Sequence, residues 1–357
     1  MKKLLMMIGA AAVAVGANAT VVTQTVDGVT WQIDIDTSTK KATLGTGSSN
    51  AAAEAGAMAV LSGMPESLVV PSTFVIDGSI YSVNNVAARA FPRNKCGVAY
   101  NITFPLDVDT TFGSYTCVSA PSLTNVLFKG PSTVAKGGAQ TYSTLTMPNK
   151  TYSILQGCAN VKFVVMGPNV KVDNKNKIES FLNKASNATV LVPRRSGNMT
   201  WDGSADISLG GTDNVVAYYG PGEEFDIEMG ATTVTMIPTT ANALTNVLTY
   251  AKTFKTAFGL DARINVTNSI EIGEGLIAAE TLEYATFNSL MFKVNTQAQL
   301  DSVLAAIPST VPFAIDASDS KSELIVPQGR EVWARLSAEG RQGKYTPKIT
   351  GLIISYH

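Results

Sequence analysis

A four-residue block that recurs at a fixed interval limits what the middle of this chain can fold into. The block starts with a small residue, has Asn in third place and has an apolar residue in fourth place. It occurs at 158–161, 185–188 and 212–215, so both intervals are 27 residues. Each block precedes a short apolar segment and then a proline, at Pro168, Pro193 and Pro221. A fixed period of this length is typical of repeat architectures.

Short strands explain why such repeats must stack. A strand of four residues cannot bury its apolar face alone, but parallel pairing with the next repeat builds one continuous core. Proline ends each strand because it has no N–H for the ladder. Segments 101–105 and 120–131 fit the pattern with less regular spacing, which gives five candidate rungs. We therefore expect a β-solenoid; five unrelated strands of an antiparallel sandwich are the alternative, which the two identical intervals disfavour.

The chain from residue 68 onward also resembles a known family. Segments 68–73, 80–83 and 86–91 look like the BspA-like (treponemal-type) leucine-rich repeats of bacterial surface proteins. The Ala90-Phe91 pair and the strand 102–105 fit that repeat. The resemblance covers residues 68–221, but Thr116-Cys117 stands where Ala-Phe is usual, and 131–151 is an insertion. It implies a leucine-rich-repeat solenoid, secretion, and protein or surface binding without catalytic residues.

The chain from residue 222 has a different pattern. Asn242–Phe258 and Thr296–Ile307 show the apolar spacing of helices, with Gly259 as a stop and Thr296 as an N-cap. Strand-like segments surround them: Thr233–Ile237, Ala262–Val266, Ser289–Val294, Pro312–Ile315, Leu324–Val326, Glu331–Ser337 and Leu352–Tyr356. The expected fold class is thus mixed α/β, a leucine-rich-repeat β-solenoid of about five divergent rungs at 68–221 followed by an α+β C-terminal domain at 222–357.

The N-terminal segment predicts export. Lys2 and Lys3 precede an apolar run, and Ala17-Asn18-Ala19 places small residues where a signal peptidase needs them. We expect residues 1–19 to be a signal peptide, because the apolar run is too short to span a membrane. No later segment is long and apolar enough to span one. Residues 20–67 form an N-terminal strand region, in which Asp27-Gly28 predicts a hairpin turn.

The composition excludes several kinds of chemistry. A formal net charge of −1 gives no basic stripe for nucleic acid. The only histidine is His357, the last residue, which argues against catalytic triads and histidine-rich zinc sites. No phosphate-binding glycine loop occurs. We expect no cofactor and no metal. The three cysteines, Cys96, Cys117 and Cys158, are expected to be small buried residues, with one disulfide as the alternative.

A few side chains remain as site candidates. Tyr219 is expected to point outward, while Tyr218 packs in the core, and Trp201 lies in a turn; Tyr219 and Trp201 are the possible ligand contacts. Three carboxylate groups are candidates for paired-carboxylate chemistry or calcium, although solvated surface charge is the commoner role. They are Asp34/Asp36, Asp107/Asp109, and Glu223-Glu224 with Asp226 and Glu228.

Three functions follow. The first is a non-enzymatic binding or adhesion module at the cell surface, in the periplasm or outside the cell. Its partner would be a protein or a surface glycan, its contact surface the repeat sheet, and nucleic acid is not expected. The second is a structural envelope or matrix protein that self-associates. The third is a carbohydrate-active hydrolase that uses two carboxylates, which a cleft holding such a pair would favour.

Overall fold

The computed structural model describes residues 13–14, 19–46, 58–91, 99–133, 140–148, 150–172, 175–179, 181–194, 207–266, 270–271, 284–289, 291–307, 313–316, 324–327, 332–335 and 349–350. The chain divides into two compact units, Met1–Tyr218 and Tyr219–His357. Most of the expected signal peptide, Trp201, Cys96 and the last expected strand lie outside the described residues.

The first sheet of unit 1, here called sheet A, is mixed. Its N-terminal strands are antiparallel, and β2 and β3 form the expected hairpin, with Asp27 and Gly28 at φ 49° and 81°. From β4 onward the path β4-β8-β10-β12-β14 is parallel. The strands are β1 Val13–Ala14, β2 Ala19–Val26, β3 Val29–Asp36, β4 Lys41–Leu44, β5 Val60–Ser62, β7 Thr73–Ile76, β8 Ser79–Val86, β10 Thr110–Phe112, β12 Ser143–Thr146 and β14 Val170–Val172.

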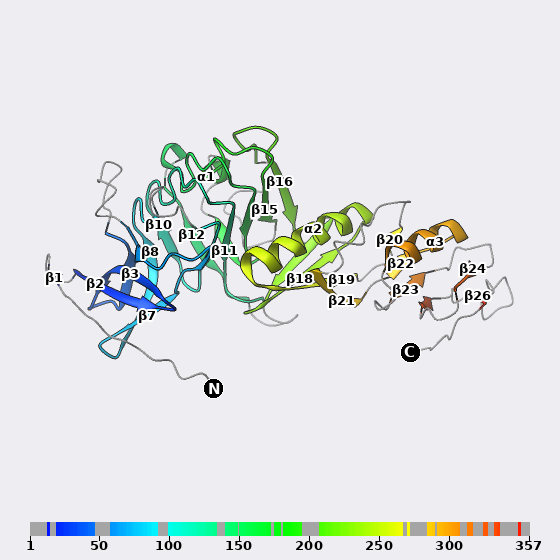
Figure 1. Cartoon of the computed structure of the whole chain (residues 1–357), viewed down its shortest axis with the longest axis horizontal. Coiled ribbons are helices and arrows are strands. Elements are labelled where there is room, and N and C mark those ends of the chain that lie inside the picture. Colours follow the sequence, from blue (N-terminus) through cyan, green and yellow to red (C-terminus); the bar gives the residue numbers. More distant parts are fainter. Residues whose placement is uncertain are drawn as a thin grey trace. The chain divides into compact units, whose positions relative to one another are not determined.

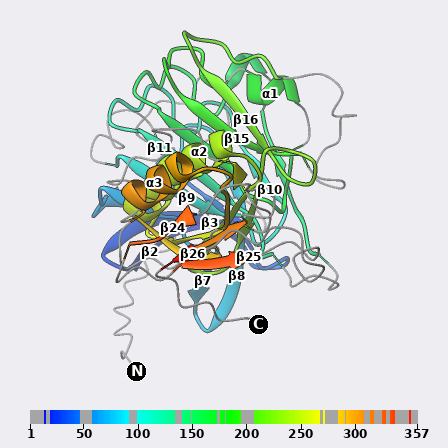
Figure 2. The ribbon, with the colours of Figure 1, turned by 90° about the vertical axis from the view of Figure 1, so that its right-hand side faces the viewer.

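The second sheet of unit 1, sheet B, has the order β16-β15-β13-β11-β9-β6, and β15 and β16 lie side by side in both views (Figures 1 and 2). The strands are β6 Ser67–Val69, β9 Asn101–Pro105, β11 Asn125–Lys129, β13 Phe163–Met166, β15 Thr189–Pro193 and β16 Val215–Tyr219. A 3₁₀ turn at Lys150–Tyr152 and helix α1, Lys175–Glu179, lie in the connections. From β6 to β15 the paired strands are parallel.

An aromatic cluster fills the core of unit 1. Phe104 and Phe128, on neighbouring strands of sheet B, stack with ring centroids 5.6 Å apart. Phe112, on β10 of sheet A, meets both edge-on at 5.0 and 5.6 Å. Phe181 extends the stack from Phe128 at 6.1 Å. Because residues from both sheets share this cluster, one apolar core connects sheets A and B.

Unit 2 contains a four-stranded sheet, β17-β18-β19-β21, with α2 packed against β18, β19 and β21 (Figure 1). A second four-stranded sheet, β20-β22-β23-β25, is parallel, and β24 pairs with β26. The elements are β17 Phe225–Met229, β18 Thr233–Pro238, α2 Ala241–Phe258, β19 Asp261–Asn265, β20 Ile270–Glu271, β21 Ala285–Ser289, β22 Met291–Lys293, α3 Gln297–Ala306, β23 Phe313–Asp316, β24 Leu324–Ile325, β25 Val332–Arg335 and β26 Ile349–Thr350.

The expected fold class is wrong. The described chain is mostly β-sheet, in several parallel and mixed sheets with three α-helices, and no leucine-rich-repeat solenoid is identified in it. The ladder of sheet B does not keep the interval of 27 residues. Ser67 lies opposite Asn101, Asn101 opposite Asn125, Asn125 opposite Phe163, and Phe163 opposite Thr189, at intervals of 34, 24, 38 and 26 residues. Leucine-rich repeats keep a nearly constant period of roughly 20–29 residues.

The helices of unit 2 are confirmed. Thr240 caps α2 and accepts a hydrogen bond from the Ala243 backbone N–H, while Gly259 ends the helix at φ 65°. Thr296 forms a capping box with Gln299 at the start of α3. The strand β17 was not expected, because its sequence, Phe-Asp-Ile-Glu-Met, was interpreted as a carboxylate cluster.

Candidate functional site

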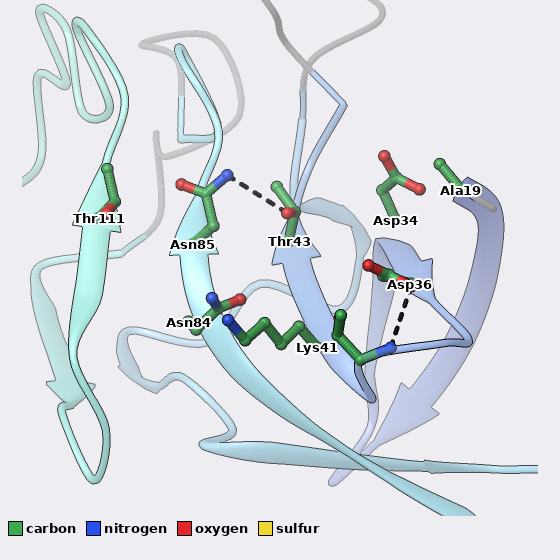
Figure 3. Close-up of a pocket in the computed structure, with 9 residues that line it drawn as sticks. Ala19, Asp34, Asp36, Lys41, Thr43, Asn84, Asn85 and Thr111 are labelled. Carbon is green, nitrogen blue, oxygen red and sulfur yellow. Dashed lines mark hydrogen bonds between the residues drawn. The ribbon is translucent and has the colours of Figure 1, made fainter. Parts of the chain in front are cut away.

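A polar pocket of about 360 Å³ opens on sheet A (Figure 3). Asp34, Asp36 and Ala19 lie together at one end of it, and Asn85 and Thr111 lie toward the other end (Figure 3). The lining consists of Ala19, Asp34, Asp36, Thr39, Lys41, Thr43, Asn84, Asn85 and Thr111. None of these side chains is aromatic or large and apolar, so the pocket offers hydrogen bonds and charge.

Strand alternation places the two carboxylates on the open face. Trp31, Ile33 and Ile35 of β3 are buried, so the residues between them face the other way. Asp34 lies opposite Thr43 of β4, and Asp36 lies opposite Lys41. Since cross-strand partners share a face of the sheet, the hairpin and β4 bring two carboxylates, an ammonium and a hydroxyl to one surface.

An irregularity on β8 adds two amides. Ala42 of β4 pairs with Val83, but the next residue, Thr43, pairs with Asn85, so Asn84 is an extra residue in the ladder. Asn85 Nδ2 donates a hydrogen bond to Thr43 Oγ1 at 3.3 Å. Thr111 of β10 lies opposite Asn85 and continues the polar row. The pocket therefore spans five strands: the consecutive strands β2, β3 and β4, and β8 and β10 from later in the sequence.

The two carboxyl groups differ in their environments. Asp36 Oδ1 accepts hydrogen bonds from Ser38 Oγ at 2.6 Å, Ser38 N at 2.9 Å and Thr39 N at 3.2 Å. These bonds, the Ser38 side chain first, lower the pKa of Asp36 to about 2. Burial, and then the neighbouring charge of Asp36, raise the pKa of Asp34 above its ordinary value.

Asp34 also has an acceptor that the described chain leaves unused. Its Oδ1 atom is buried and accepts no hydrogen bond from any described residue. A buried acceptor without a partner is costly, and a donor that approaches through the pocket would relieve that cost. Together with the Lys41 ammonium and the amides of Asn84 and Asn85, this atom can fix the orientation of a polar, hydroxylated group.

The aromatic candidates are placed differently from expectation. Tyr219 is fully buried, and its ring centroid lies 6.1 Å from that of Phe225, so the expected outward orientation is wrong. Tyr218, which was expected in the core, is only half-buried and packs against the core of unit 1, and its hydroxyl accepts a hydrogen bond from Ile207 N at 2.6 Å. Trp201 lies outside the described residues. Tyr219 therefore does not line the pocket on sheet A.

The other carboxylate candidates do not form a comparable site. Asp109 Oδ1 accepts a hydrogen bond from Thr144 N at 2.6 Å, and Asp226 Oδ1 accepts one from Ile227 N at 2.7 Å. Within the described residues, no group of three or more His, Cys, Asp or Glu side chains is arranged to hold a metal ion. Of the three carboxylate groups singled out in the sequence, Asp34/Asp36 lines the pocket on sheet A and the other two do not.

The two described cysteines are buried thiols, as expected. Cys158 Sγ donates a hydrogen bond to the Cys117 carbonyl oxygen at 2.7 Å. Burial raises the pKa of the Cys158 thiol to about 12, which makes it a poor nucleophile. A disulfide between these two residues is therefore not part of the structure.

Sheet B is not the exposed contact surface that we expected of the repeat strands. Val126, Val164 and Val190 are buried in the core of unit 1, and their neighbours Leu127, Val165 and Leu191, which face the other way, are buried as well.

Sequence reasoning found Asp34 and Asp36 in the pocket on sheet A but missed Lys41, Asn84, Asn85 and Thr111. Of these four residues, only Asn84 and Asn85 could have been singled out from the sequence, because this polar pair interrupts the alternation of β8.

No known protein-family model matches this chain, and no curated protein or solved structure matches it either. Among the described residues, no helix combines the length and apolar character needed to cross a membrane.

Proposed function

We propose that this protein is a non-enzymatic binding module that acts outside the cytoplasm and holds a hydroxyl-rich surface glycan in the pocket on sheet A. The observation that carries the proposal is the buried Asp34 Oδ1 at one end of the pocket, which accepts no hydrogen bond from any described residue. A sugar hydroxyl can donate to the Asp34 carboxylate, which lines the pocket, while accepting from Lys41 or the Asn85 amide. The carboxylates of Asp34 and Asp36 in the lining favour neutral or amino sugars over acidic ones.

Binding to defined sugars tests the proposal. The processed protein is titrated calorimetrically with neutral, amino and acidic oligosaccharides. Asp34→Ala should weaken binding of the accepted sugars about tenfold or more, because a hydrogen bond to a charged group contributes roughly 1.5–3 kcal/mol. Asp77→Ala, at the β7–β8 turn outside the pocket, is the matched control and should leave affinity unchanged. Equal binding by both variants, or binding of acidic sugars only, would refute the assignment.

One observation favours a second candidate, a glycoside hydrolase. Asp34, whose pKa is raised, and Asp36, whose pKa is lowered, are the kind of pair that divides acid and base roles. Against it, Asp36 Oδ1 already accepts three hydrogen bonds, and a carboxylate with a pKa of about 2 is a weak base. Release of reducing ends from polysaccharide that is lost in both Asp34→Asn and Asp36→Asn would favour this candidate over the binding module.

The resemblance to BspA-like surface proteins supports the proposed class of function, binding outside the cell, and nothing finer. The leader-like segment at 1–19 supports export. Self-assembly into an envelope or matrix structure is the structural alternative. Sizing of the processed protein separates the two, because a binding module of this kind stays at one small size over a hundredfold range of concentration and an assembling protein does not.

A further inference from the structure

The backbone register of the first hairpin places the expected cleavage point directly beside the two pocket carboxylates. Ala19 lies opposite Asp36, Thr20 opposite Ile35 and Val21 opposite Asp34. Ala19 is itself part of the pocket lining (Figure 3). Neighbouring strands lie about 4.7–4.9 Å apart, so a charge on the backbone nitrogen of Thr20 would be close to both carboxylates.

We infer that removal of the leader after Ala19 creates an α-ammonium group on Thr20 that pairs with Asp36 and completes the pocket. This inference rests on the proposed export. Hydrolysis of the Ala19–Thr20 peptide bond consumes one water, leaves the carboxylate on Ala19 and frees the amine of Thr20, which takes up a proton at neutral pH. The new terminus replaces the Ala19 side of the lining with a cation that has three donors.

Charge and burial both favour this pairing. The lining carries the carboxylates of Asp34 and Asp36 on β3 and the ammonium of Lys41 on β4, so its formal charge is −1. The α-ammonium brings that charge to zero. It also faces Asp34, whose ionisation is opposed by burial and by the charge of Asp36. Lys41 extends toward Asn84 and leaves the end of the pocket next to Ala19 to the new terminus (Figure 3).

A site of this kind exists only in the processed chain. Before cleavage the nitrogen of Thr20 is an uncharged amide within β2, and Val13 and Ala14 of β1 pair with Val21 and Thr20. After cleavage β1 is gone and β2 becomes the edge of sheet A. The ligand site proposed above would thus be assembled by export itself, and the unprocessed precursor would lack one of its donors.

Titration of the new terminus tests the inference without any ligand. The secreted protein is first analysed by mass spectrometry, and its first residue should be Thr20. The pKa of the α-amine is then measured by competitive acetylation across pH. We expect a value at least about half a pH unit above the ordinary 7.7–8.0.

Two variants make the result specific. Asp36→Asn, which can still accept the hydrogen bonds from Ser38 and Thr39, should lower the pKa of the α-amine toward its ordinary range, because only the Asp34 carboxylate then remains beside it. Asp77→Asn, at the Asp77-Gly78 turn where Asn is equally accepted, should leave it raised. A first residue other than Thr20, an ordinary α-amine pKa in the wild type, or an elevation that Asp36→Asn leaves unchanged would each overturn the inference. Failure to bind sugars would not affect these measurements, so the two proposals fail separately.

Discussion

Asp34 and Asp36 are two residues apart on one face of β3, and folding moves their pKa values in opposite directions. The difference comes from their surroundings. Hydrogen bonds from the β3–β4 turn stabilise the charged form of Asp36, whereas burial opposes the charged form of Asp34. Two carboxylates with the same side chain therefore contribute to stability with opposite dependence on pH.

The first prediction concerns the opposite pH dependence of these two contributions to stability. The pKa of Asp36 falls from 3.8 to about 2 on folding, so its stabilisation is present above pH 4 and is lost as pH falls toward 2. The raised pKa of Asp34 acts in the other direction: stability decreases as pH rises from 3.8 through the folded-state pKa. In thermal unfolding followed between pH 2 and 7, Asp36→Asn should flatten the loss of stability below pH 4, and Asp34→Asn should stabilise the protein at pH 7. Identical pH profiles for both variants would contradict these assignments.

The second prediction concerns Cys158. A buried thiol with a pKa of about 12 that donates to a carbonyl group should resist alkylation at pH 8. Iodoacetamide labelling followed by peptide mapping should find the Cys117 and Cys158 peptides unmodified in the native protein and fully modified in denaturant. Native labelling of Cys158 at the rate of a small-molecule thiol would show that the thiol is accessible.

At the scale of elements, local signals defined α2 more reliably than any strand of unit 1. The apolar face of the helix and Gly259 predicted this helix from the sequence, and the cap that the structure adds, Thr240, also acts locally. Strand boundaries depend instead on partners far away in the sequence. The extra residue Asn84 illustrates this, because only the pairing of β4 with β8 defines it.

The third prediction concerns the end of α2. Gly259 has φ 65°, and a Cβ atom placed there would meet nothing within 4 Å. Gly259→Ala should therefore cost about 1–2 kcal/mol from backbone strain alone. Gly259→Asn, which tolerates the left-handed conformation better, should cost less. Denaturant unfolding of unit 2, followed by circular dichroism, measures the free energy of unfolding of both variants. Equal losses of stability in the two variants would contradict backbone strain as the cause.

At the scale of the whole molecule, the two units divide the core. The aromatic cluster around Phe128 belongs to unit 1, and Phe254 of α2 belongs to unit 2. Both side chains are fully buried. Units with separate cores can unfold in separate steps, in which case the chain as a whole is not two-state.

The fourth prediction follows from this division. Phe128→Ala should cost unit 1 about 3–5 kcal/mol, and Phe254→Ala should cost unit 2 a similar amount. Hydrogen exchange with peptide resolution should show lost protection only in the unit that carries the substitution. Simultaneous loss in both units would mean that the chain unfolds as one cooperative body.

The sequence determined the local features of this protein. The alternation of β3 with its Asp27-Gly28 turn, the two helices of unit 2 with their caps, and the shared face of Asp34 and Asp36 all follow from residues close together in the chain. Tertiary structure alone decided the strand register in sheet B, the burial of Tyr219 and the meeting of Asp34, Lys41, Asn85 and Thr111 in one pocket. The physical reason is range: helix caps and hairpin turns depend on neighbours a few residues away, whereas a ladder register depends on which distant strand completes its hydrogen bonds and apolar contacts.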